Sequence, residues 1–295
     1  MARSAIDRSQ ARFAWIFLAP ALGVLAVIGI YPLLNTLFVS LTDSEAGQVT
    51  TKIIGFKNYA TIFGDGDFLR SILNTLIFAV CSVTLELVIG MATALVLHVE
   101  FRGRAILRAA VLIPWAIPTV VSARMWEWML NDSFGVINDL MVRKFHLLAH
   151  PIAWTGTNSF AMASIIAVDV WKTFPFFALL LLAGLQGIPK ELYESAHVDG
   201  ATAWQQFWRI TLPLLKPAIT VAVIFRALDA LRVFDVVWVL THGKFATESV
   251  GTYAYRQLFG FLNAGTGSAT CITLFLMVFV FVLVYTALMR EPERS

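Results

Sequence analysis

The sequence predicts an all-α membrane protein with six transmembrane helices and one helical loop between two of them. Hydrophobic residues make up 58% of the 295 residues and charged residues only 14%, which does not describe a water-soluble globular domain. Six apolar stretches are each long enough to cross a hydrocarbon core of about 30 Å. One mostly polar passage with a regular internal pattern lies between two of these stretches. Together these observations predict a polytopic membrane protein.

The first half of the chain contains three of the predicted spans, at residues 13–41, 71–99 and 105–129. The first of them contains Pro20 and Pro32, which membrane helices tolerate better than soluble helices do. A polar loop follows it, and a short basic turn joins the second span to the third.

The second half contributes spans at residues 159–186, 214–240 and 266–289, and the polar passage covers residues 187–213. We find no internal repeat and no low-complexity segment in the sequence. Residues 1–295 are therefore predicted to form a single membrane domain.

The distribution of basic residues predicts the orientation of the spans. If the N-terminus is cytoplasmic, the inner segments hold eleven Lys and Arg residues and the outer loops hold seven, although the outer loops are longer. Cytoplasmic segments carry the excess of basic residues in membrane proteins. We therefore expect both termini and the 187–213 passage to be cytoplasmic.

The 187–213 passage has a pattern of its own. Pro189 suits the first turn of a helix, and Gly200 is expected to end that helix. Small and acidic residues repeat along it as Glu194, Ser195 and Ala196, then Asp199, Gly200 and Ala201. Small side chains there would let another protein approach the backbone closely. An amphipathic hairpin lying on lipid is the alternative interpretation.

Ionisable residues gather at one predicted depth in the membrane. A helix rises about 1.5 Å per residue, and on that count the residues near the midplane are Glu86, Asp169, Lys172, Arg226 and Asp229. Each costs roughly 2.5 to 3.5 kcal/mol at the centre of a lone helix, so such residues are expected to face protein or water. A polar site at the midplane follows from their shared depth.

Two interpretations of these charges are open from the sequence. Arg226, Asp229, Arg232 and Asp235 alternate in sign along the fifth span and could form a ladder that only braces the helices. Asp169 and Lys172 form a similar predicted pair, and Glu86 is the weakest member because one buried carboxylate can simply bond a neighbouring helix. Alternatively the charges bind a substrate, with the nearby aromatic rings of Trp171, Phe174, Phe176 and Phe177 stacking on sugar faces or only packing.

Other chemistries have little support in the sequence. No phosphate-binding loop is present, so the chain is not expected to hydrolyse ATP, and no catalytic residues are predicted. The five histidines show no metal-ligand spacing, and basic residues are not clustered as nucleic-acid binding requires, so neither a metal nor a nucleic acid is expected. A proton-driven secondary carrier using Glu86 and Asp169 is the rival function, but it would not need the 187–213 passage.

The passage resembles the EAA loop of permease subunits in binding-protein-dependent ABC importers. The family pattern is EAA, two residues, DGA, about eight residues and then I-x-LP, and this chain departs from it only in having Ser195 for the middle alanine. Further segments resemble sugar permeases of the maltose and glycerol-phosphate type, and residues 55–59 resemble the corresponding segment of the maltose-pore F-type subunit. These segments are residues 55–59, 74–76, 102–104, 113–118, 126–129, 135–138, 232–235 and 239–241.

The resemblance implies a type I ABC importer permease fold in a bacterial or archaeal cytoplasmic membrane. It implies a second homologous permease, an ATPase dimer that holds ATP and Mg, and an extracytoplasmic sugar-binding protein as partners, with lipid around the spans. It implies that the 187–213 loop seats in the ATPase and that a carbohydrate lies mid-membrane; trehalose, another oligosaccharide and glycerol phosphate stay open. The lining residues it implies, together with Asp229 from the charge count, are Trp115, Thr119, Asp169, Lys172, Thr173, Phe176, Arg226, Asp229, Ala230 and Val233.

Overall fold

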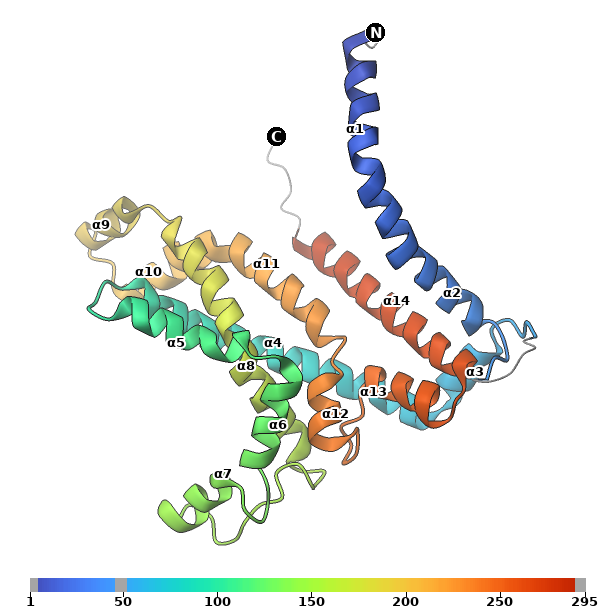
Figure 1. Cartoon of the computed structure of the whole chain (residues 1–295). Coiled ribbons are helices and arrows are strands. Elements are labelled where there is room, and N and C mark those ends of the chain that lie inside the picture. Colours follow the sequence, from blue (N-terminus) through green and yellow to red (C-terminus); the bar gives the residue numbers. More distant parts are fainter. Residues whose placement is uncertain (1–4, 46–51, 290–295) are drawn as a thin grey trace. The chain divides into compact units, whose positions relative to one another are not determined.

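The computed structural model describes residues 5–45 and 52–289 (Figure 1). The chain is helical almost throughout these residues, apart from loops and one isolated bridge between Thr42 and Ile53. It separates into two compact units, Met1–Asp65 with Ala254–Thr273 and Gly66–Tyr253 with Leu274–Ser295. The single domain expected over residues 1–295 stays a prediction.

The first unit is organised around Asn58. Its elements are α1 (Ala5–Leu25), a π-helical turn (Ala26–Ile30), α2 (Tyr31–Ser40), α3 (Lys57–Gly64), a second π-helical turn (Arg256–Gly260) and the start of α14 (Ala264–Met289). The buried amide nitrogen of Asn58 donates to the carbonyls of Ser40 and Thr42, each at 2.8 Å. Its amide oxygen accepts a 3.5 Å hydrogen bond from Thr266. One side chain of the 55–59 segment therefore joins the end of α2 to the beginning of α14.

The second unit holds most of the helices. They are α4 (Gly66–His98), α5 (Arg104–Ala116), α6 (Thr119–Met129), α7 (Val136–Asn138) with a π-helical turn (Asp139–Lys144), α8 (Ala161–Gln186), α9 (Lys190–Val198), α10 (Ala203–Gln206) with a π-helical turn (Phe207–Thr211), α11 (Leu212–Ala230), α12 (Asp235–Thr241), most of α13 (Val250–Tyr255) and the rest of α14. The α4–α5 turn and α9 lie at the same end of this unit (Figure 1), where Lys190 Nζ is 3.7 Å from Glu100 Oε1.

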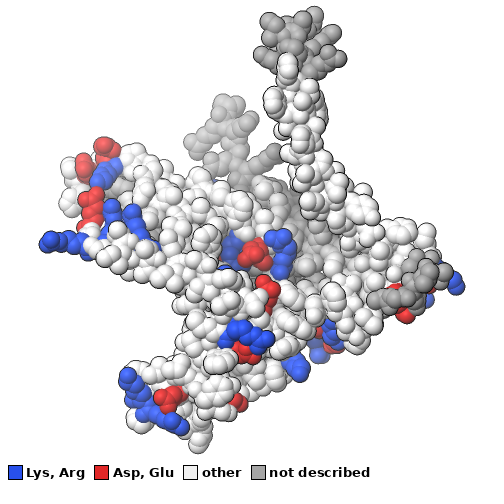
Figure 2. All heavy atoms as spheres, viewed as in Figure 1, with Lys and Arg blue, Asp and Glu red and all other residues white. Residues whose placement is uncertain are grey.

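Five helices in the described part of the chain are long and apolar enough to cross a membrane. They are Phe13–Ser40, Gly66–His98, Ala161–Gln186, Ala203–Ala230 and Ala264–Leu288. The bent pair α5–α6 makes a sixth when it is counted as one span. Many large apolar side chains on these helices are exposed, and Figure 2 shows a mostly uncharged surface with charged side chains gathered in a few places. Such a surface suits lipid rather than water.

The third predicted span, residues 105–129, is not one straight helix. α5 ends at Ala116, and Ile117 has an extended backbone with φ −75° and ψ 133°. Proline disfavours the helical conformation at the residue before it, and Pro118 therefore accounts for this break. α6 begins at Thr119 and runs at 93° to α5.

The fifth predicted span, residues 214–240, is also interrupted. α11 ends at Ala230, and α12 begins only at Asp235. The carbonyl of Val233 in the intervening turn accepts a 2.8 Å hydrogen bond from the Ser249 hydroxyl. Gly251 lies so close that an added Cβ would be 2.9 Å from the same oxygen. A later segment of the chain therefore holds the turn open, and Arg232 is not on the helix that carries Arg226.

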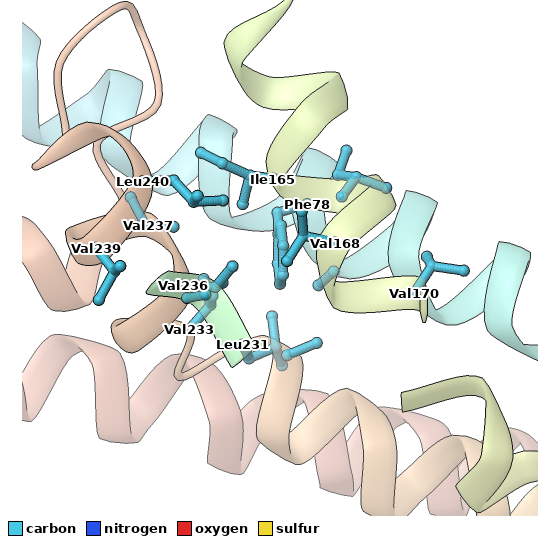
Figure 3. Close-up of a cluster of buried hydrophobic side chains, with 14 of the residues drawn as sticks. Phe78, Ile165, Val168, Val170, Leu231, Val233, Val236, Val237, Val239 and Leu240 are labelled. Atoms are coloured by element: carbon cyan, nitrogen blue, oxygen red, sulfur yellow. The ribbon is translucent and has the colours of Figure 1, made fainter. Parts of the chain in front are cut away.

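The core of the second unit is the contact between α4 and α8. A Cβ at Gly90 would collide with the Cβ of Phe177, so these two helices approach as closely as a glycine allows. Figure 3 shows Phe78, Ile165 and Val168 gathered near apolar side chains of the 231–234 turn and α12. The 231–234 turn and α12 therefore pack against the α4–α8 pair, and this packing positions one wall of the site described next.

Candidate functional site

A cavity of about 110 Å³ lies in the second unit where the two interrupted spans meet α8. Its wall comes from α4, α6, α8, α11, the 231–234 turn and α12. The lining residues are Phe78, Thr119, Asp169, Lys172, Thr173, Arg226, Asp229, Ala230, Arg232, Val233, Phe234, Asp235 and Val236. Both breaks contribute the first residue of a helix, Thr119 of α6 and Asp235 of α12. Discontinuous helices build such polar sites in membrane transporters because their ends present free backbone groups to a ligand.

Arg226 is the centre of the charged wall. It is only 4% exposed, and its Nε and Nη2 donate to Glu86 Oε2 and Oε1 at 2.7 and 3.0 Å. This bidentate arrangement is the strong geometry for a guanidinium and a carboxylate. Nη2 also pairs with Asp169, and Nη1 donates to Asp229 Oδ2 at 3.2 Å. One guanidinium therefore holds three carboxylates from α4, α8 and α11.

Thr173 connects the carboxylate of Glu86 on α4 to the backbone of α8. Its hydroxyl oxygen lies 2.6 Å from Glu86 Oε1 and 2.5 Å from the carbonyl oxygen of Asp169. Glu86, Asp169 and Thr173 are all buried, so these contacts replace water for groups that would otherwise be unsatisfied. The buried polar side chains of this network therefore satisfy one another's hydrogen-bonding groups.

The rest of the cavity wall carries charges that this network does not neutralise. Within the described residues, no ion pair reaches Lys172, Arg232 or Asp235, and Arg232 Nε donates to the Leu228 carbonyl at 3.0 Å. The Asp229 side chain is 70% exposed although it touches Arg226. Charged groups held open beside a buried network can bind hydroxyls or charges of a ligand.

Most of the predicted lining residues meet at this cavity. Thr119, Asp169, Lys172, Thr173, Arg226 and Asp229 line it, as do Ala230 and Val233. Trp115 and Phe176 do not line it; their rings stack on each other with centroids 6.3 Å apart. Their part in binding stays a prediction.

One expectation about the charges is wrong. Asp169 does not pair with Lys172, the residue three positions along α8; it pairs with Arg226 of α11. Glu86 bonds a neighbouring helix, as expected of a single buried carboxylate: it makes the bidentate contact with Arg226 and does not line the cavity. No periodic signal links residues 140 positions apart, and only the buried position of a carboxylate in an apolar span indicated Glu86.

The 187–213 passage forms two short helices, and the first of them ends beside Gly200 as expected. Pro189 precedes α9, which carries Glu194, Ser195 and Ala196, and Asp199 follows its last residue. Gly200 has φ +79°, and the N–H groups of Gly200 and Ala201 donate to the carbonyls of His197 and Ala196. These two bonds are a Schellman motif, which needs a left-handed residue at the position of Gly200.

The second short helix starts from a capping box. Thr202 accepts from the Gln205 N–H, and the Gln205 side chain accepts from the Thr202 N–H. Beyond it, the rings of Trp204, Phe207 and Trp208 contact one another, and Trp204 is 70% exposed. Local hydrogen bonds and ring contacts therefore hold both helix ends of the passage, which presents small, acidic and aromatic side chains outward. Within the described residues, no group of three or more His, Cys, Asp or Glu side chains could hold a metal ion.

Comparison with known proteins identifies the class of membrane protein. Residues 86–292 match the family model described as binding-protein-dependent transport system inner membrane component. The chain is 42% identical over 284 residues to the trehalose/maltose transport system permease protein MalF of Thermococcus litoralis, covering 96% of this chain and 95% of that protein. It is 37% identical over 298 residues to the trehalose transport system permease protein SugA of Mycobacterium tuberculosis, covering 99% and 95%.

A solved structure has the same fold over almost the whole chain. It is the bacterial alginate ABC transporter in complex with an alginate pentasaccharide-bound periplasmic protein. A chain of that complex aligns with a TM-score of 0.84 and 25% identity, covering 98% of both chains. The predicted all-α polytopic fold of type I ABC importer permeases is confirmed. The chain belongs to the family of binding-protein-dependent transport system inner membrane components, so it is a multi-pass permease subunit of an ABC transporter and not an enzyme.

Proposed function

We propose that this chain is one of two permease subunits of an ATP-driven importer for a neutral di- or oligosaccharide. The cavity at the two helix breaks carries this proposal. The charged side chains that line it are three cations, Lys172, Arg226 and Arg232, and three carboxylates, Asp169, Asp229 and Asp235, so the formal charges of the lining balance. Positively and negatively charged hydrogen-bonding groups whose charges sum to zero suit the many hydroxyl groups of a neutral sugar.

The size of the cavity supports a second permease subunit. Ligand sites typically have volumes of roughly 300–1,000 Å³, whereas this cavity has about 110 Å³. This chain would then supply one wall of the site, and a homologous permease would supply the opposite wall. Trehalose and maltose are the first candidates because relatives over almost the full chain have names that specify them.

The energy would come from a separate ATPase dimer that binds ATP and Mg, with no cofactor on this chain. The α9–α10 segment, with Glu194, Ser195, Ala196, Asp199, Gly200 and Ala201, is the surface we assign to ATPase docking. ATP-driven closure of the dimer would move this segment and open the cavity alternately to the two sides. An extracytoplasmic binding protein would deliver the sugar. Both termini would be cytoplasmic, although residues 1–4 and 290–295 lie outside the described part of the structure.

The test is reconstitution of the purified complex in proteoliposomes. We expect an ATPase to co-purify with the chain and uptake of labelled trehalose or maltose to require ATP and the binding protein. An anionic sugar of the same size, such as a uronic-acid disaccharide, is the matched control and should not be taken up. Sugar uptake that persists without any ATPase would instead identify a secondary carrier.

A further inference from the structure

Glu86 is outside the cavity but is connected to its wall through Arg226. Glu86 is 0% exposed and is not among the lining residues. Its two carboxylate oxygens accept from Nε and Nη2 of Arg226 at 2.7 and 3.0 Å. Two parallel contacts to a planar guanidinium fix its rotation as well as its position. The remaining terminal nitrogen, Nη1, is thereby directed at Asp229 on the cavity wall.

Charge balance alone does not require Glu86. Asp169 also pairs with Arg226 and is buried, so it could neutralise the guanidinium by itself. A second buried carboxylate adds an excess negative charge in a region where unpaired charge is unfavourable. Unlike Asp169, Glu86 makes a bidentate contact with Arg226, and this contact sets the orientation of the guanidinium. The contact joins α4, which contributes only Phe78 to the cavity wall, to the helix that carries Asp229.

We propose that Glu86 is a positioning residue for substrate binding. It sets the rotation of Arg226, and Arg226 holds Asp169 and Asp229 where they receive the sugar. Glu86 itself touches no substrate. This inference rests on the proposed function, and it separates Glu86 from residues that only hold the helices together.

The test is a double-mutant cycle on the assembled importer. The four proteins are the native chain, Glu86→Gln, Arg226→Gln and the double variant, each measured for the KM and Vmax of sugar uptake. We expect Glu86→Gln to raise KM on the order of ten-fold, mainly in KM rather than Vmax, because binding geometry is disturbed. The double variant should be no worse than Arg226→Gln alone, because Glu86 acts only through Arg226.

Two further variants separate positioning from stability. Gly90→Ala disturbs the packing of α4 against Phe177 one turn from Glu86 and changes no charge, so it should lower the thermal midpoint and leave KM unchanged. Glu86→Asp keeps the buried charge and supports assembly, but it withdraws the carboxylate by about one C–C bond, roughly 1.5 Å. We expect this variant to assemble and still to raise KM.

Specific results would overturn the inference. Additive KM effects of Glu86→Gln and Arg226→Gln would show that Glu86 does not act through Arg226. If Glu86→Asp keeps the native KM but lowers the thermal midpoint as Gly90→Ala does, Glu86 only stabilises the helix packing. This comparison distinguishes the two roles even if the glutamine variants do not assemble. A native complex that takes up no sugar contradicts the proposed function itself, and that failure is seen before any variant is compared.

Discussion

At the scale of single residues, the cavity depends on how one cation is shared among several carboxylates. Arg226 contacts Glu86, Asp169 and Asp229, whereas Lys172 lines the same cavity with no ion-pair partner in the described chain. Removal of Arg226 would leave the buried carboxylates of Glu86 and Asp169 without their cation. Removal of Lys172 leaves no ion-pair partner behind, and Lys172 is therefore the cleaner probe of binding.

We predict that Lys172→Gln weakens transport without weakening the protein. No buried partner is left unpaired, so the thermal midpoint of the assembled complex should stay near the native value. Loss of one charge-assisted hydrogen bond of about 1.5 kcal/mol to the sugar should raise the KM for uptake roughly ten-fold. Lys144→Gln, which removes an exposed cation far along the chain and outside the cavity, is the control. Equal KM values for both variants and the native protein would remove Lys172 from the site.

At the scale of elements, the apolar runs predicted the membrane helices well but not their interruptions. The break before Thr119 has a sequence signal, because Pro118 follows Ile117 directly. The break at residues 231–234 contains neither glycine nor proline, and it depends on Ser249 and Gly251, which approach Val233 from a later loop. Local sequence cannot report such a tertiary contact.

The same limit applies to the candidate site. Depth along each helix could be counted, so Asp169, Lys172, Arg226 and Asp229 were predictable as one polar layer. Pairing could not be counted, because Glu86 and Asp169 reach Arg226 across 140 and 57 residues of sequence. Resemblance to a family indicated Thr119 and Thr173 in the wall, but it also indicated Trp115 and Phe176, whose rings stack on each other outside the wall.

Our prediction for an element concerns the α9–α10 segment. Apart from its chain neighbours, an added Cβ at Gly200 would meet no atom of the described residues within 4 Å, but φ +79° strains any L-residue there. Gly200→Ala should therefore lower stability by about 1 kcal/mol and leave ATP hydrolysis coupled to uptake. Gly200→Trp carries the same strain and adds bulk on the proposed docking surface, so uptake should be lost while ATP hydrolysis continues. The ratio of sugar transported to ATP hydrolysed distinguishes them; equal ratios in both variants would mean that the surface does not dock.

At the scale of the whole molecule, the six-span arrangement requires one orientation in the membrane. We expect a reporter fused after Arg104 or Arg209 to be cytoplasmic, because those loops hold the excess of basic residues. Reporters after Lys57, Lys144 and Lys244 should be external. Paired phosphatase and fluorescent reporters, which are active on opposite sides, make the measurement. Any position read on the wrong side contradicts the six-span arrangement with cytoplasmic termini.

The central claim is that substrate passes through the cavity where two spans are interrupted. Thr119→Cys places a thiol in the wall of that cavity, and Lys57→Cys places one at the exposed first residue of α3, both in a background with Cys81→Ser and Cys271→Ser. The measurement is the rate at which a water-soluble thiol reagent labels each cysteine in the assembled complex, with and without the transported sugar. We expect the sugar to slow labelling at position 119 and to leave the labelling rate at position 57 unchanged. Equal labelling rates at position 119 with and without the sugar, in a complex that still transports the sugar, would contradict passage of the substrate through this cavity.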